Sequence, residues 1–444
     1  MTKAISKSKL IDMLQNARRR TDELVEGLSA EQLMGPRIGT VNPLRWEIGH
    51  VAYFYEYFIL RELYGEPSLL GNERADTLYD SINIAHNDRW DLPLLSLEDT
   101  KAYMQGVLDK LVKRLPEGLA SETQSFLYQF GIFHEDMHTE AFIWARQSLA
   151  YPTPNFANSV DARKLRSAGA HAGFIEIPGG KFPLGAPADA AFMFDNEKMA
   201  HNVNVKPFSI AKAPVTNSEF AEFVAAGGYQ NCDYWCEDGL KWKTDNKSQH
   251  PGYWFNRGDG QWFMRRFDQT LPLPDNEPVV HITWYEANAY CHWAGLRLPT
   301  EIEWEVAALG YADDDGHLSP HKRQYPWGDC YPTDDQCNLD GRALGCVDVA
   351  AHASGDSAFG CRQMLGNVWE WTNDTFQPYP GFSADAYTEY STVLFGSTKV
   401  LRGGAWSSRS RMLHGTYRNF FEPHRWNIFS GFRTCQITLE KLDL

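Results

Sequence analysis

The sequence predicts an α+β multidomain protein in which a helical bundle is followed by a loop-rich, mixed α/β domain. The chain has 444 residues, more than one hydrophobic core usually organises. Apolar residues recur at three- and four-residue steps as far as residue 150, and short extended runs between turn residues follow from Phe174 onward. We therefore expect a first domain over 1–150, a linker over 151–170 and a second domain over 171–444.

Four helices are expected in the first domain. Two longer apolar helices should lie near residues 43–64 and 122–148, and Ser96 to Asp99 reads as a capping box that opens another helix. The remaining pattern consists of apolar residues at helical spacing, namely Leu10, Met13, Leu14, Ala17 and Leu24, and then Met104, Val107, Leu108, Leu111 and Leu115. Four such helices make a bundle.

The linker and the second domain differ from the bundle in their turn residues. The segment YPTPNFANSV, with two prolines and two asparagines, interrupts the helical periodicity. Beyond it, extended runs alternate with brief helices, for which Thr216 to Glu219, Thr283 to Glu286 and Thr300 to Glu303 each fit the capping-box pattern. The second domain is therefore expected to be mixed and rich in loops.

Composition narrows the range of partners. The net charge of -15 argues against a nucleic-acid partner, which would need clustered Lys and Arg. The sequence has no run of about 18 apolar residues, so no membrane-spanning helix is expected. The N-terminus also lacks the apolar segment of a signal peptide. We expect a cytoplasmic protein.

A metal site is predicted inside the bundle. In the segment FLYQFGIFHEDMHTEAFIWAR, His134 and His138 fall on one helical stripe, with side chains roughly 6 Å apart. His50, in the other strongly apolar helix, is the best candidate for a third ligand. Two buried imidazoles without partners cost about 1–3 kcal/mol each, which favours a metal over a purely structural role. Three neutral imidazoles suit zinc as well as iron.

One alternative arises from the same helix. His134 to His138 also reads H-E-x-x-H, the pattern of zinc metalloproteases, in which Glu135 would be the general base. This helix ends an all-helical domain, however, and no further ligand segment follows it. A zinc hydrolase remains an alternative function.

The two halves resemble known families. The first half is similar to a DinB-type domain, and residues 170–436 resemble the formylglycine-generating-enzyme (sulfatase-modifying factor) fold, a C-type-lectin-like architecture. The second resemblance rests on motifs in the order of that family: FDNEKMAHNV, KAPVTNSEFAEFV, PVVHITWYEANAYCHWAGLRLPTEIEWEVAA, YPWG, LGNVWEWTND, VLRGGAWS and GFRTC. Their fusion is the layout of the EgtB-like sulfoxide synthases of ergothioneine biosynthesis and of their SenA-like, selenoneine-forming relatives.

This resemblance implies a cofactor and substrates. In that family, non-haem iron(II) on three histidines activates O2 and couples a sulfur or selenium donor to the imidazole C2 of hercynine. The matching ligands here would be His50, His134 and His138. The donor would be a thiol or a selenosugar, and the stretch RNFFEPHRWNIFSGFRTC is more similar to the selenoneine-forming branch.

The resemblance also implies substrate-binding residues. Aromatic faces would hold the quaternary ammonium group, and guanidinium or amide donors would hold carboxylates. The implied substrate-binding residues are Asn419, Arg425, Arg418, Arg89, Phe420, Phe421, Met137 and Tyr379.

The chain departs from the family pattern at three positions. Phe421 replaces an acidic residue that helps to bind the donor, Met137 often corresponds to Gln, and Phe376 stands near the position of the proton-donating tyrosine. We therefore expect a rebuilt donor pocket, and a proton donor among Tyr79, Tyr379 and Tyr53.

Two further functions compete with the synthase. Formylglycine generation requires a cysteine pair near the C-terminal motif, but no cysteine lies between Cys361 and Cys435. A non-catalytic, lectin-like binding module is the other alternative, and metal-dependent O2 consumption distinguishes it from the synthase.

Overall fold

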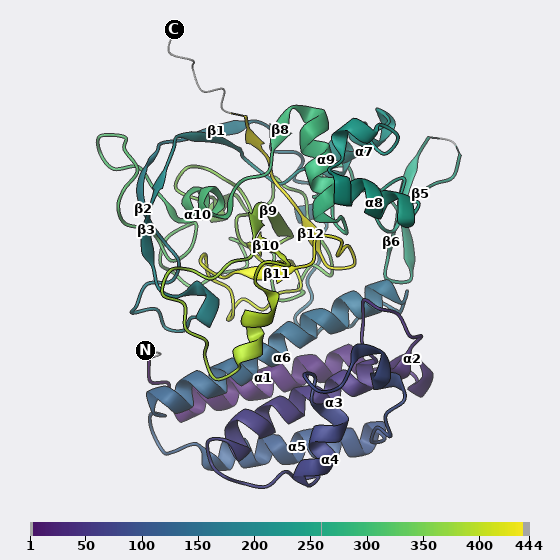
Figure 1. The fold of residues 1–444 in the computed structure, drawn as a ribbon, viewed down its shortest axis with the longest axis vertical. Coiled ribbons are helices and arrows are strands. Elements are labelled where there is room, and N and C mark those ends of the chain that lie inside the picture. Colours follow the sequence, from purple (N-terminus) through teal and green to yellow (C-terminus); the bar gives the residue numbers. More distant parts are fainter. Residues whose placement is uncertain (1–2, 259, 438–444) are drawn as a thin grey trace. The chain divides into compact units, whose positions relative to one another are not determined.

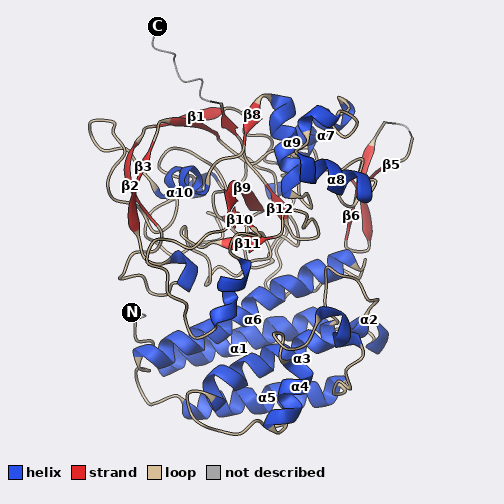
Figure 2. Ribbon diagram, in the orientation of Figure 1, coloured by secondary structure: helices blue, strands red, loops and turns tan. Residues whose placement is uncertain are grey.

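The computed structural model describes residues 3–258 and 260–437 and divides them into two compact units. Unit 1 comprises residues up to 157 together with 189–192, and unit 2 comprises 158–188 and the described residues from 193 onward. In Figure 2, unit 1 consists of helices and loops, whereas the strands belong to unit 2. The predicted α+β fold, a helical bundle followed by a mixed domain, is confirmed.

Unit 1 is built on four long helices that pack side by side in Figure 1. They match the four helices predicted from periodicity: α1 (Lys7–Val25), α3 (Leu44–Tyr55), α5 (Leu97–Arg114) and α6 (Glu122–Ser148). The helix predicted near residues 43–64 corresponds to α3 together with the π-helix η1 (Glu56–Arg61), which continues it. Three shorter elements were not predicted: α2 (Ala30–Met34), α4 (Asn72–Tyr79) and the 3-10 helix η2 (His86–Trp90).

Local sequence explains where these helices begin. The Ser6 side chain caps α1 by accepting from the Lys9 amide, and Ser96 accepts from the Asp99 amide at the start of α5. Ser121 forms a capping box with Gln124 ahead of α6. α3 follows Pro43 and is buried on almost every side, as expected for a helix that is apolar all round. α6 contacts both α1 and α3, so α3 and α6 face each other within the bundle.

Residues 189–192 belong to unit 1 although they lie far along the chain. Phe192 stacks on Phe126 with ring centroids 5.4 Å apart, and it meets Phe133 edge to face at 4.7 Å. Both partners lie on α6, and no periodicity in the sequence signalled this return of the chain.

Unit 2 contains short strands and brief helices. Its helices are η3 (Leu165–Ser167), η4 (Asp195–Glu197), α7 (Asn217–Ala225), η5 (Cys232–Tyr234), α8 (Glu237–Asp245), α9 (Trp284–Ala294), α10 (Glu301–Leu309), η6 (Ala353–Gly355), η7 (Thr388–Tyr390) and η8 (Thr392–Leu394). Its strands are β1 (Phe174–Ile177), β2 (Gly180–Leu184), β3 (His201–Val205), β4 (Phe208–Ala211), β5 (Trp254–Asn256), β6 (Trp262–Arg266), β7 (Gln269–Pro272), β8 (Leu296–Arg297), β9 (Trp369–Thr375), β10 (Lys399–Arg402), β11 (Asn419–Phe421), β12 (Ser430–Gly431) and β13 (Cys435–Gln436). The capping boxes predicted at Thr216, Thr283 and Thr300 open α7, α9 and α10.

The strands form small sheets. Two have four strands, in the orders β1-β4-β13-β8 and β11-β10-β9-β12, and β2-β3 and β5-β6-β7 form two smaller sheets. Within these sheets β12 pairs with β9 in parallel, and the other pairs are antiparallel. A core cluster that includes Phe182, Phe208 and Trp304 packs strands β2 and β4 against α10.

Among the described residues, no helix combines the length and the apolarity that crossing a bilayer requires.

Candidate metal centre

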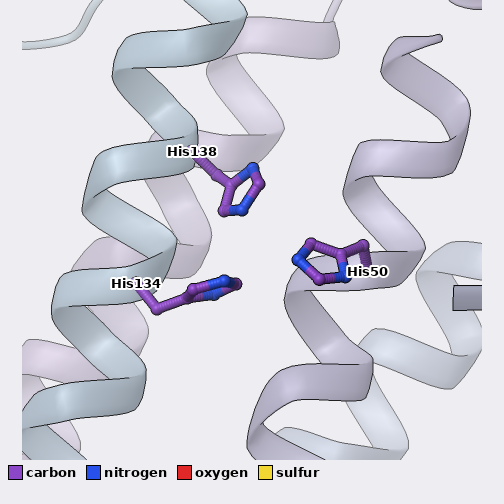
Figure 3. Close-up of side chains that lie close together, drawn as sticks. All are labelled: His50, His134 and His138. Carbon is purple, nitrogen blue, oxygen red and sulfur yellow. The ribbon is translucent and has the colours of Figure 1, made fainter. Parts of the chain in front are cut away.

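Three histidines converge inside unit 1. His50 lies on α3, and His134 and His138 lie one turn apart on α6. Their side chains point toward one another in Figure 3, and one ligand nitrogen from each lies within 4.8 Å of the others. His50 and His134 are buried, whereas the His138 side chain is 19% exposed. The spacing on one helix and the apolar character of the other thus bring the three predicted ligands together.

His50 is held on two sides. Its Nδ1 lies 2.8 Å from the Tyr79 carbonyl oxygen. Its ring stacks on Trp46 with centroids 4.8 Å apart and planes 9° apart. The Arg89 guanidinium covers the Trp46 ring at 3.9 Å. Because a carbonyl can only accept, Nδ1 carries the proton and Nε2 keeps a lone pair for a metal.

His134 is held by stacking instead. The Phe54 ring lies parallel to its imidazole, with centroids 3.6 Å and planes 8° apart. Within the described residues, its Nδ1 is buried and has no hydrogen-bond partner. Packing alone therefore fixes the plane of this ring.

His138 has a charged partner. Its Nδ1 lies 3.0 Å from Oε1 of Glu47, a carboxylate that is only 2% exposed. The Asn42 amide donates to the same oxygen at 3.4 Å, and Arg89 donates to the Asn42 side-chain oxygen at 2.7 Å. A line of hydrogen bonds thus leads from a guanidinium to this imidazole.

The protonation states suit metal binding. Burial, and then repulsion by His138, hold the pKa of His50 well below its usual value. The same two causes, with His50 in addition, hold the pKa of His134 well below its usual value. Metal ligation requires neutral imidazoles, with nitrogen about 2.1 Å from the ion. The three ligand nitrogens lie within 4.8 Å of one another, close to the separation that a shared ion requires, so these residues fit a bound transition metal.

Glu135, the general base of the zinc-hydrolase alternative, is engaged elsewhere. Its carboxylate is 1% exposed and accepts from Arg18 at 3.2 Å and from Thr21 at 2.7 Å, both on α1. Tyr55 donates to its other oxygen at 2.9 Å. These contacts tie α1 and α3 to α6, which is a structural role.

The three tyrosines suggested as proton donors lie in different surroundings. The Tyr53 hydroxyl donates to Asp76 at 2.8 Å, and Tyr379, in unit 2, donates to Glu301 at 3.2 Å. Burial, reinforced by these carboxylates, raises the pKa of both hydroxyls. Tyr79 is fully buried, burial raises the pKa of its hydroxyl too, and its main-chain carbonyl contacts His50.

Two substrate-binding candidates of unit 2, Arg418 and Tyr379, lie in its buried interior, whereas Phe420 is half-buried. The Arg418 guanidinium donates to both oxygens of Glu301, at 2.7 and 3.0 Å, and covers the Tyr379 ring at 4.0 Å. Phe420 stacks on Phe376 with centroids 4.2 Å apart. Phe376 is fully buried. Arg418 and Tyr379 thus share one carboxylate.

The remaining candidates are less buried. Asn419 and Phe421 are half-buried on β11, and Arg425 lies 5.7 Å from the Phe421 ring centroid. Burial lowers the pKa of Arg425. In unit 1, Met137 is half-buried beside His138, and Arg89 is half-buried over Trp46.

Sequence reasoning missed three groups that hold the ligands. Glu47 lies three residues before His50, a spacing that places both on one helical face and could have signalled it. Phe54 lies one turn after His50 and could have been suspected in the same way. The Tyr79 carbonyl is main chain, so no residue type points to it.

Comparisons with known proteins cover nearly the whole chain. The Sulfatase-modifying factor enzyme 1-like domain family matches residues 161–437, and the DinB superfamily matches residues 13–142. The formylglycine-generating enzyme of Streptomyces coelicolor is 29% identical over 279 residues, which is 56% of this chain and 81% of that protein.

Two relatives match along nearly their full length. The hercynine oxygenase of Mycolicibacterium smegmatis is 36% identical over 436 residues, covering 97% of this chain and 99% of that protein. The hercynine oxygenase of Mycobacterium tuberculosis is 37% identical over 423 residues, covering 95% and 96%. The chain, with its DinB-type and sulfatase-modifying-factor-like domains, belongs to the hercynine oxygenase family.

Proposed function

We propose that this protein is a non-haem iron(II), O2-dependent synthase that joins a sulfur or selenium donor to the imidazole C2 of hercynine. The observation that carries this proposal is the convergence of three histidines in a chain 36% identical to a hercynine oxygenase over nearly its whole length. The product would be the sulfoxide precursor of ergothioneine or the selenoxide precursor of selenoneine.

The proposed metal is iron because the proposed reaction reduces O2. Zinc has no accessible redox states, whereas sites with three protein ligands and open positions are typical of iron(II) oxygenases. When bound, iron(II) supplies the electron transfer to O2 that no side chain of the bundle can provide.

The reaction balances as a four-electron oxidation. The C2–H bond of hercynine and the S–H or Se–H bond of the donor break, and a C2–S or C2–Se bond forms. One oxygen atom of O2 is retained on sulfur or selenium. The other leaves as water with the two hydrogens, so O2 is the only oxidant required.

The residues of unit 1 prepare the site for this reaction. The lowered pKa values of His50 and His134 keep both imidazoles neutral at physiological pH. Trp46 and Phe54 fix the planes of these rings by stacking. Preorganised ligands position the reactants without costly rearrangement.

The substrate-binding residues that the resemblance implies are proposed one by one, each from its surroundings within its own unit. Half-buried Arg89, Asn419 and Arg425 supply donors for carboxylates, while Phe420 and Phe421 offer aromatic faces to the trimethylammonium group. Arg418 is the weakest of the candidates, since Glu301 already takes two of its donors. Met137 would shape the donor side because it adjoins His138 in the sequence.

The alternatives have less support. A zinc hydrolase would need Glu135 free to activate water, but three side chains already occupy its carboxylate. A purely lectin-like binding module gives no role to three imidazoles arranged around a common point.

A donor panel tests the proposal. Protein purified anaerobically and reconstituted with iron(II) would receive hercynine, O2 and one donor at a time: cysteine, a glutamyl-cysteine thiol, a thiosugar or a selenosugar. Mass spectrometry should find a hercynine adduct carrying one added oxygen with at least one donor, and none with His134→Ala. The absence of any adduct with all donors, from protein with iron bound, would refute the synthase.

A further inference from the structure

The orientation of the His138 ring relies mainly on a single partner, whereas stacked rings hold the other two histidines. His50 has the Tyr79 carbonyl and the Trp46 ring, and His134 has the Phe54 ring. Within the described residues, the aromatic rings that His138 contacts are those of the two other histidines, and its hydrogen bond is formed with Glu47. Because its side chain is also the most exposed of the three, packing restrains it least.

Among the described residues, no Lys or Arg forms an ion pair with Glu47. Its carboxylate is 2% exposed, and its partners in the described chain are the His138 imidazole and the Asn42 amide. Glu135, another buried carboxylate of this bundle, pairs directly with Arg18. A buried carboxylate without a paired positive charge is costly. A metal ion on the far side of the His138 ring would supply that charge.

The hydrogen bond between Glu47 and Nδ1 of His138 sets the tautomer of the His138 imidazole. A carboxylate only accepts, so Nδ1 of His138 carries the proton and Nε2 keeps its lone pair. The negative charge also makes the imidazole a stronger donor to a metal, as carboxylates do behind ligating histidines elsewhere.

We infer that Glu47 is a positioning residue for the metal centre, holding His138 in the orientation and tautomer that bind the ion and strengthening its bond. This inference rests on the proposed function only in requiring a metal at the three histidines. Asn42 and, through it, Arg89 hold the carboxylate in place.

The test compares three variants in the full chain. Glu47→Ala removes the contact, and Glu47→Gln keeps an oxygen that accepts from Nδ1 but removes the charge. Glu56→Gln is the matched control, because Glu56 is also a buried carboxylate that no described cation pairs with, and it directly follows α3. It accepts from Tyr103 and from the Leu69 amide, and within the described chain it forms no hydrogen bond with a histidine.

The readouts are metal affinity, from anaerobic titration with iron(II) and cobalt(II), and the rise in Tm that the metal produces. Carboxylate partners of ligating histidines typically contribute about 10- to 100-fold in affinity. We therefore expect Glu47→Ala to weaken binding by about that factor, Glu47→Gln to fall between it and the wild type, and Glu56→Gln to retain wild-type affinity. The Tm of the metal-free variants measures how much each substitution destabilises the fold. A positioning role predicts a loss of metal affinity beyond any such destabilisation.

Wild-type affinity in Glu47→Ala would overturn the inference while leaving the metal centre intact. An equal loss in Glu56→Gln would also overturn it, since any buried carboxylate of this region would then have the same effect. If the wild-type chain itself bound neither metal, the proposed function would fail together with this inference.

Discussion

The Phe54 ring lies parallel to the His134 imidazole, with 3.6 Å between centroids and 8° between planes. Stacking at this distance is the restraint on a ring whose Nδ1 has no hydrogen-bond partner in the described chain. Phe54 is therefore part of the candidate metal centre although it offers no ligand atom.

We predict that Phe54→Leu weakens metal binding more than it weakens the fold. Leucine keeps most of the apolar volume but cannot form a flat stack, so the His134 ring gains freedom. Phe142→Leu on α6 is the matched control, because Phe142 is fully buried and forms no ring contact in the described residues. Metal titration and thermal unfolding of both variants check this. Equal metal affinity in the two variants would contradict a role for the stack.

Gly49 provides a second prediction. A Cβ at this position would lie 2.1 Å from a ring carbon of Tyr79, and a Tyr79 shift would carry away the carbonyl that holds His50. Gly49→Ala should cost about 1–3 kcal/mol of stability and weaken metal binding. Denaturant unfolding and metal titration measure the two effects. Adding Tyr79→Leu should restore part of both, and a double variant no better than Gly49→Ala would argue against this steric coupling.

The variant Glu135→Gln distinguishes the proposed synthase from the zinc-hydrolase alternative. Glu135→Gln leaves Arg18 with a neutral partner, and breaking a buried ion pair costs about 3–5 kcal/mol. We expect a lowered Tm, with metal affinity and hercynine-dependent activity per folded molecule retained. A zinc-loaded wild-type protein that cleaves casein, together with loss of that cleavage in Glu135→Gln, would instead support the hydrolase.

Acid should destabilise unit 2 through Glu305. Burial by itself raises the pKa of this carboxyl, but Lys322 and Arg402 outweigh burial and bring the pKa down to about 2. The folded pKa lies below the ordinary value of 4.5, so this contribution to stability is complete above 4.5 and is lost as the pH falls toward 2. A difference of this size corresponds to on the order of 3 kcal/mol.

The matching measurement is urea unfolding of wild-type protein and Glu305→Gln at several pH values. The stability difference between the two should be largest at neutral pH and should shrink as the pH falls below 4.5. A difference that stays constant with pH would show that the charge of Glu305 is not its source.

Much of the bundle could be predicted because its signals are local. Four-residue spacing placed His134 and His138 on one face of α6, and continuous apolar character marked α3 as the helix that carries His50. The capping boxes at Thr216, Thr283 and Thr300 begin their helices where the side-chain pattern predicted. Such features depend on residues a turn or less apart.

The features of the fold and of the candidate site that were not predicted depend on contacts between segments far apart in the sequence. Tyr79 reaches His50 through a main-chain carbonyl, and Phe192 returns to α6 from far along the chain. Arg418 resembles a ligand-binding arginine in the sequence, yet Glu301, 117 residues away, takes two of its donors. Only the folded structure shows which polar group another residue has already satisfied.

The measurement that tests the central claim most directly is O2 uptake by the iron(II)-reconstituted protein. The account predicts uptake that requires hercynine and a sulfur or selenium donor together, and that disappears in His138→Ala, which lacks one of the three converging imidazoles. Unchanged uptake in His138→Ala, or no uptake by the iron-loaded wild type with any donor, would contradict it.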